Sequence, residues 1–157
     1  AARVWCADFL YLCKIMEQNR NDSTSQVFDP LRRRNVALTP EERVRQWFIG
    51  ILSKEMCVPS HMMMSEVSIH LGGKKFRADI LVYDRELKPL AVVECKRPEV
   101  ALDEKVISQA MAYNMVLNVK YLIVTSGVST HIFRRTEDSF EALDKVPDYQ
   151  QMLEYIV

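Results

Sequence analysis

Asp79, Glu94 and Lys96 have side-chain types and a spacing that suit metal-dependent phosphodiester hydrolysis. Two carboxylates offer the hard oxygen ligands that Mg²⁺ prefers, and water completes its coordination. A metal held there would polarise a phosphate and lower the pKa of a bound water. Lys96 would orient that water, help to deprotonate it, or offset the charge that develops on the transition state. The peptide carbonyl of Cys95 is a candidate further metal ligand.

Two neighbouring strands must position these groups. Residues 76–83 are predicted to form a strand that carries Asp79. Residues 90–93 are a continuous apolar run, typical of a strand buried on both faces, and Glu94 and Lys96 extend it. Because side chains repeat every two residues along a strand, the glutamate and the lysine are expected on the same side. If the two strands pair as a hairpin, the three groups converge at one edge of the sheet.

A simpler interpretation stays open at this point. Asp79 would pair with Arg77, and Glu94 with Lys96, as exposed charges that contribute little to stability. The position of Glu94 and Lys96 directly after a buried strand favours a functional role, because charges there are costly unless they are paired or used.

The other elements can be read from capping and periodicity. Thr39-Pro40-Glu41-Glu42 predicts a helix start, with Thr39 as the N-cap and Glu42 as its capping-box partner. Further along the chain we expect strands at 65–71, 121–125 and 129–134, and helices at 102–117 and 148–156. A helix links the strand at 90–93 to the one at 121–125, so these two should be parallel. The prediction is an α/β fold, a mixed central sheet flanked by helices in the order α-β-β-β-α-β-β-α.

Composition narrows the class of protein. The formal net charge is zero, which argues against a strong free-standing DNA binder. No apolar run approaches the roughly 20 residues that cross a membrane, and Asp8 and Lys14 interrupt the first apolar segment, so we expect neither a membrane span nor a secretory signal. Four cysteines without a CxxC pair fit reduced thiols in a cytoplasmic protein.

Five motifs occur together in one order along residues 28–135. They are Phe28-Asp29-Pro30-Leu31-Arg32, Thr39-Pro40-Glu41-Glu42-Arg43-Val44-Arg45-Gln46, Arg77-Ala78-Asp79-Ile80, Glu94-Cys95-Lys96-Arg97-Pro98 and Gln109-x-x-x-Tyr113. This set resembles the N-terminal nuclease domain of type I restriction enzyme R subunits (HsdR), a branch of the PD-(D/E)xK superfamily. Ala78 replaces the proline that usually precedes the motif aspartate.

The resemblance implies a restriction-endonuclease-like core over residues 36–157, with 1–35 as an N-terminal extension that forms a hairpin or a helix. It implies a Mg²⁺-dependent DNA endonuclease in which Mn²⁺ can substitute. Asp79 and Glu94 would be metal ligands and Lys96 the catalytic lysine.

The same resemblance assigns the surrounding residues. Gln109 and Tyr113 would contact the DNA backbone or brace the site, and Arg77 and Arg97 would be further DNA contacts. The superfamily often adds a glutamate from its first helix. Glu41 is preferred here because it lies at the edge of the buried stripe, and Glu42 is kept as the alternative. Asp29 and the run Arg32–Arg34 are carried as DNA or domain contacts.

One feature of type I R subunits is missing from the sequence. These proteins carry an ATP-driven translocase after the nuclease, and the printed chain contains no GxxxxGK[ST] motif. We therefore expect either a stand-alone relative or a fragment, with DNA as partner and a separate motor or specificity subunit as a further one. A homodimer is left open. The alternative function is a nucleic-acid or protein-binding module that keeps the nuclease fold and does not cleave.

Overall fold

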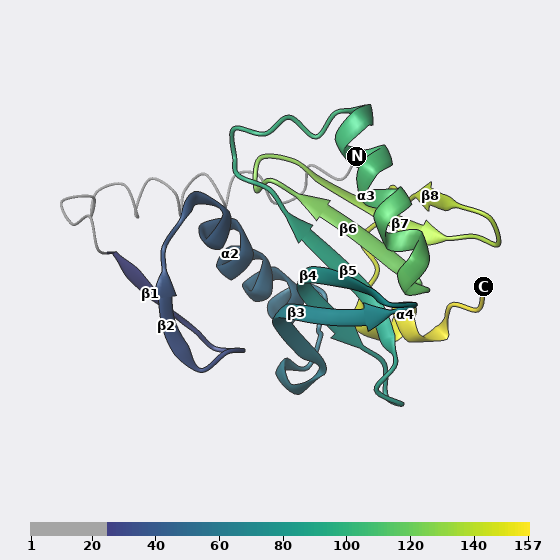
Figure 1. Ribbon diagram of the computed structural model, residues 1–157. Coiled ribbons are helices and arrows are strands. Elements are labelled where there is room, and N and C mark those ends of the chain that lie inside the picture. Colours follow the sequence, from purple (N-terminus) through teal and green to yellow (C-terminus); the bar gives the residue numbers. More distant parts are fainter. Residues whose placement is uncertain (1–24) are drawn as a thin grey trace.

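The computed structural model describes residues 25–157 (Figure 1). The first 24 residues, which include Cys6, Cys13 and most of the predicted N-terminal extension, lie outside the described residues.

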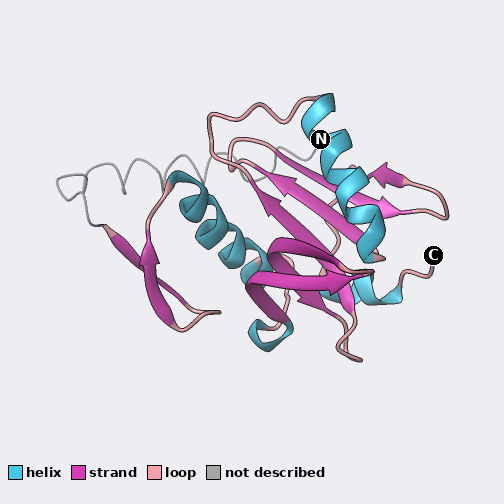
Figure 2. Cartoon of the chain, in the orientation of Figure 1, coloured by secondary structure: helices cyan, strands magenta, loops and turns pink. Residues whose placement is uncertain are grey.

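A six-stranded mixed sheet forms the centre of the described chain (Figure 2). Its strands lie side by side in sequence order: β3 (Met63–Leu71), β4 (Lys74–Tyr83), β5 (Pro89–Cys95), β6 (Tyr121–Thr125), β7 (Thr130–Arg135) and β8 (Phe140–Ala142). The pair β5–β6 is parallel, as the connecting helix predicted, and the other neighbours are antiparallel. The predicted mixed α/β fold is confirmed, and β8 is an addition that the sequence reading missed.

Helices cover both faces of this sheet. The helices are α2 (Pro40–Lys54), α3 (Glu104–Asn114) and α4 (Tyr149–Glu154), with short 3₁₀ turns η1 (Ser60–Met62) and η2 (Met115–Leu117). Side chains of α2 and α4 share one buried cluster with the sheet, and α3 contributes to a second cluster on the other face. Within the described residues, no helix is long and apolar enough to span a membrane.

Helix α2 begins where its capping residues predict. Thr39 Oγ1 accepts a hydrogen bond from the backbone N–H of Glu42 at 3.1 Å, and Pro40 occupies the first turn. Its inner face buries Val44, Phe48 and other apolar residues, and each such side chain stabilises the fold by about 2 kcal/mol.

Strands β3 and β4 reverse the faces that they bury near the middle of each strand. On β4, Ala78 packs in the cluster beside α3, whereas Ile80, two residues on, packs in the cluster beside α2. On β3, Met63 and Val67 show the same reversal. Regular strands keep alternate residues on one face. The reversal coincides with Glu66, whose φ of 54° places it in the left-handed region, which is uncommon for a residue other than glycine.

A hairpin precedes α2 and forms a separate two-stranded sheet of β1 (Gln26–Asp29) and β2 (Arg34–Ala37). Asp29 at its turn is fully buried and accepts hydrogen bonds from the backbone N–H groups of Leu31 and Arg32, from the Arg32 side chain, and from Ser65 Oγ on β3. The predicted domain boundary between residues 35 and 36 falls inside β2, so the hairpin joins both sides of it.

Candidate active site

One pocket gathers most of the predicted site residues. It has a volume of about 660 Å³ and is named here the Asp79 pocket. Its lining comes from α2, β4, the end of β5 and α3: Glu41, Arg77, Asp79, Glu94, Cys95, Lys96, Val100, Val106, Gln109, Ala110 and Tyr113.

Asp79 is held at both carboxylate oxygens. Its Oδ2 accepts a hydrogen bond from the backbone N–H of Cys95 at 2.7 Å, and its Oδ1 lies 2.9 Å from Nη2 of Arg45. The simpler interpretation, in which Asp79 pairs with Arg77, is wrong on this point, because Arg77 pairs with Glu66. The side chain of Asp79 is 19% exposed, so it remains accessible from the pocket.

Glu94 lies on the neighbouring strand, as the hairpin prediction required. Ile80 pairs with Val93 in the antiparallel register, which sets Asp79 opposite Glu94. Glu94 Oε1 accepts a hydrogen bond from Asn114 Nδ2 at 2.8 Å. Its Oε2 lies 3.9 Å from Lys96 Nζ, so the two side chains point to the same side of β5 in a loose ion pair.

The two helix glutamates have different surroundings. Glu41 lines the Asp79 pocket, and its side chain is 44% exposed. Partial burial and the negative charge of Asp79 raise the pKa of Glu41. Glu42 is 7% exposed; its Oε1 lies 2.6 Å from Arg32 Nη2 and accepts from Gln46 Nε2 at 2.8 Å. These contacts take the place of the predicted capping-box bond, and Glu42 does not line the Asp79 pocket.

Of the residues predicted to touch DNA, Tyr113 is held by contacts within the fold, whereas Gln109 and Arg97 line the pockets. The hydroxyl of Tyr113 accepts a hydrogen bond from the backbone N–H of Arg77 at 2.8 Å, and its ring lies 5.1 Å from that of Phe76. Tyr113 thus braces α3 against β4. Gln109 is exposed, and lines the same pocket. Arg97 does not line the Asp79 pocket. It lines the adjacent pocket that is described next.

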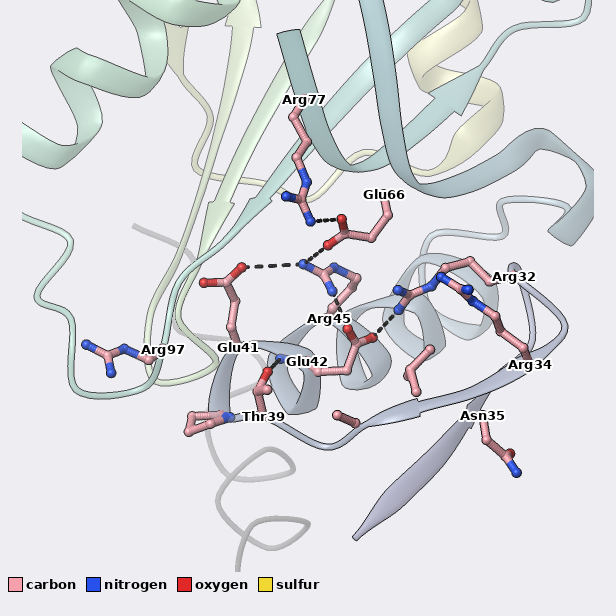
Figure 3. Close-up of a pocket in the computed structure, with 13 residues that line it drawn as sticks. Arg32, Arg34, Asn35, Thr39, Glu41, Glu42, Arg45, Glu66, Arg77 and Arg97 are labelled. Atoms are coloured by element: carbon pink, nitrogen blue, oxygen red, sulfur yellow. Dashed lines mark hydrogen bonds and ion pairs between the residues drawn. The ribbon is translucent and has the colours of Figure 1, made fainter. Parts of the chain in front are cut away.

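A second pocket, the Arg45 pocket, adjoins the first and shares Glu41 and Arg77 with it. Its volume is about 890 Å³. Figure 3 shows Arg45 among the acidic side chains that line it, with Arg32 and Arg34 of the hairpin region along one side. Five arginines line this pocket, namely Arg32, Arg34, Arg45, Arg77 and Arg97.

Arg45 is a site residue that the sequence reading missed. It is 3% exposed and forms ion pairs with four carboxylates, those of Glu41, Glu42, Glu66 and Asp79. Burial alone would lower the pKa of Arg45, but Asp79, Glu42 and Glu66 outweigh it and raise the pKa above its ordinary value. Its position four residues after Glu41, next to the buried Val44, was the available signal.

Two further residues were also missed. Asn114 is completely buried and donates both to Glu94 and to the carbonyl of Ala110, each at 2.8 Å. Glu66 lies between Ser65 and Val67, which pair with Ile80 and Ala78, so it faces Asp79 across the strands. Neither has a short-range sequence signal, because the partners that tie them to the site, Glu94 for Asn114 and Arg45 and Arg77 for Glu66, lie on other elements.

The donor set fits a Mg²⁺ ion that keeps much of its water. Among the described residues, no three His, Cys, Asp or Glu side chains are grouped closely enough to hold a metal by themselves. Mg²⁺ is commonly bound through one or two carboxylates with several waters retained. Asp79 and Glu94 meet that need, because each carboxylate oxygen has two lone pairs and a single hydrogen bond leaves one for a further contact. The Cys95 thiol is buried, which raises its pKa well above the ordinary value and disfavours thiolate ligation.

The described residues form a helix-flanked mixed α/β sheet that carries Asp79 and Glu94 on adjacent strands and Lys96 just after the second of them. Residues 40–147 match the family described as Type I restriction enzyme R protein N terminus (HSDR_N), and the chain belongs to this family. The predicted resemblance is thereby confirmed.

A solved structure supports the fold. The chain is similar to a fragment assigned as the HsdR subunit of a type I restriction enzyme from Vibrio vulnificus YJ016, with a TM-score of 0.53 and 21% identity. The match covers 71% of this chain and 24% of the Vibrio chain, so it spans about a quarter of that solved fragment. No curated protein matches the sequence significantly.

Proposed function

We propose that this chain is a Mg²⁺-dependent endodeoxyribonuclease domain of the type I restriction class. The observation that carries the proposal is the convergence of Asp79, Glu94 and Lys96 in one pocket, from strands that the sheet register places side by side. Membership in the R-protein N-terminal family supports the same activity. Mn²⁺ is proposed as a substitute for Mg²⁺, since both accept hard oxygen ligands.

Each residue has a defined part in this proposal. Asp79 and Glu94 hold the cation, with the carbonyl of Cys95 as a further oxygen ligand and Glu41 at the pocket edge. The cation would polarise the scissile phosphate and activate water. Lys96, whose side chain is 39% exposed, reaches into the pocket to hold the attacking water and to offset charge on the phosphate.

DNA would approach over the two adjoining pockets. The exposed Gln109 and the pocket-lining arginines Arg77 and Arg97 would contact its phosphates. Because the net charge of the chain is zero, DNA delivery would depend on a separate motor or specificity subunit. A cytoplasmic location belongs to the proposal and agrees with free thiols at Cys57 and Cys95.

The test combines Mn²⁺ binding by calorimetry with cleavage of supercoiled plasmid. Wild type is expected to bind Mn²⁺ and to nick the plasmid, and the double variant Asp79→Ala/Glu94→Ala to lose both. The control Glu137→Ala/Asp138→Ala removes two exposed acids that line neither pocket, so it should behave as wild type. Circular dichroism verifies that every variant is folded.

The same experiment distinguishes the nuclease from a second candidate function, a binding module that keeps the fold and does not cleave. One observation favours that module: both oxygens of Asp79 already have protein partners, Arg45 and the Cys95 N–H. Metal binding without cleavage of any DNA form, with or without partner subunits, would establish it. Absence of Mn²⁺ binding by wild type would contradict the metal site itself.

A further inference from the structure

Three carboxylates from three elements converge on one nitrogen atom of Arg45. Nη2 lies 3.4 Å from Glu41 Oε1 on α2, 2.6 Å from Glu66 Oε1 on β3 and 2.9 Å from Asp79 Oδ1 on β4. A terminal guanidinium nitrogen carries only two hydrogens. Glu66 and Asp79 are the two closest acceptors, and Glu41 is therefore held mainly by charge and remains turned to the pocket.

The guanidinium is fixed in this place from its other side. Nη1 of Arg45 pairs with Glu42, and Glu42 is itself held by Arg32 and Gln46. Glu66 reaches Nη2 from the strand position with left-handed backbone, and its second oxygen pairs with Arg77. Non-glycine residues in such a conformation cost energy and gather at functional sites. Arg45 is thus a rigid group and not a side chain free to swing away.

This cation acts on the metal ligands in two opposing ways. Its hydrogen bond to Oδ1, together with the Cys95 N–H on Oδ2, sets the orientation of the Asp79 carboxylate. Its positive charge next to Asp79 and Glu41 also repels a divalent ion that would bind them, in a partly buried place where screening by water is weak.

We propose that Arg45 is a positioning residue that orients Asp79 and Glu41 for the reaction and, as a built-in counter-charge, weakens the affinity of the Asp79 pocket for its cation. This inference rests on the proposed nuclease function. If Arg45 were merely structural, its loss would loosen the site and lower both the metal affinity and the cleavage rate. The inference instead predicts that the metal affinity rises while the cleavage rate falls.

The test uses the full chain with Mn²⁺ alone as the binding probe, and plasmid cleavage at saturating Mn²⁺. Arg45→Met removes the charge and keeps most of the apolar stem. It should bind Mn²⁺ about tenfold more tightly than wild type and cleave at least about tenfold more slowly. The control is Arg43→Met on the same helix, which lines neither pocket and should leave both quantities at wild-type values.

Arg45→Lys keeps the inference testable if the methionine variant does not fold. It retains the charge but loses the planar fork that reaches four carboxylates. Its Mn²⁺ affinity should stay within about twofold of wild type, while cleavage falls about tenfold. Equal or weaker Mn²⁺ binding by folded Arg45→Met, or wild-type cleavage by Arg45→Lys, would overturn the inference. If the wild type itself does not bind Mn²⁺, the proposed function is overturned and not this inference alone.

Discussion

The side-chain amide of Asn114 lies 2.8 Å from Oε1 of Glu94, and Asn114 is completely buried. The same nitrogen is 2.8 Å from the carbonyl oxygen of Ala110. Both neighbours are acceptors, so the nitrogen of the amide must face them. Helix α3 therefore fixes a carboxylate at the end of β5, although α3 contributes no acidic residue to the pocket.

Replacing this donor by an acceptor should be severe. Asn114→Asp would place a buried carboxylate against the partly buried Glu94, and like charges there raise the pKa of the new carboxyl in the folded state. We expect a loss of about 3 kcal/mol in the free energy of unfolding at pH 7. Because the folded pKa is raised, the loss should shrink as the pH falls through that value towards the unfolded pKa of about 4.

Urea denaturation at pH 7 and pH 4.5 measures this effect. Asn118→Asp is the matched control, because Asn118 is exposed at the end of η2. Its φ of 52° lies in the left-handed region, which asparagine and aspartate both adopt more readily than most residues. Equal stability of the two variants at pH 7 would contradict the assigned contact with Glu94.

Asp29 should control stability in acid. Burial raises its pKa, but hydrogen bonds from Arg32, Leu31 and Ser65 outweigh this and hold the pKa below its ordinary value of 3.8. A carboxyl with a lowered folded pKa stabilises the fold above 3.8 and loses this contribution as the pH falls through the folded value. Asp29→Asn should cost about 2 kcal/mol at pH 7.

The measurement is the unfolding free energy of wild type and Asp29→Asn at pH 7, 4 and 2.5. The gap between the two proteins should be widest at pH 7 and narrow below 3.8. Asp138→Asn, at an exposed residue, serves as control and should show no such gap. A gap that is independent of pH would mean that the charge of Asp29 is unimportant.

Tyr113 and Gln109 should respond differently to substitution. Tyr113→Phe removes the hydroxyl that accepts from the Arg77 N–H and keeps the ring on Phe76, so it should lower stability by about 1 kcal/mol and leave DNA affinity unchanged. Gln109→Ala, at an exposed pocket residue, should weaken DNA binding without destabilising the fold. Fluorescence anisotropy with metal-free protein measures the DNA affinity of each variant, and thermal unfolding measures its stability. The reverse pattern would make Tyr113 the DNA contact.

The two described cysteines should differ in reactivity. Cys57 is exposed, whereas Cys95 is buried and its pKa is raised well above the ordinary value. Because the thiolate is the reactive form, iodoacetamide at pH 7.5 should modify Cys57 in the native protein and Cys95 only in denaturant. Peptide mapping by mass spectrometry distinguishes the two. Modification of both at one rate would place Cys95 at the surface.

Local signals account for the parts of the fold that the sequence predicted. The Thr39 cap, the proline after it and the apolar run before Glu94 each act within a few residues of chain, and each lies where it was expected. That Glu94 and Lys96 point to the same side of β5 likewise follows from strand geometry alone. The short strands β2 and β8 were missed, since three or four residues carry too little periodicity.

Long-range contacts account for what the sequence did not predict. Arg45 reaches Asp79 across 34 positions of chain, and Asn114 reaches Glu94 across 20. In isolation each reads as an ordinary polar helical residue. Glu66 interrupts an alternating strand, and its carboxylate pairs with Arg45 on α2 and Arg77 on β4. Such partners are fixed only when the sheet and helices have assembled.

The hairpin contacts have a consequence for where this domain can be cut. The family match begins at Pro40, yet Arg32 in the hairpin holds Glu42, which in turn holds Arg45. A fragment trimmed to the matched segment would lose Arg32 and leave Glu42 with one cation fewer. The smallest piece that can be excised with its site intact therefore starts at or before Gln26, fourteen residues ahead of the match.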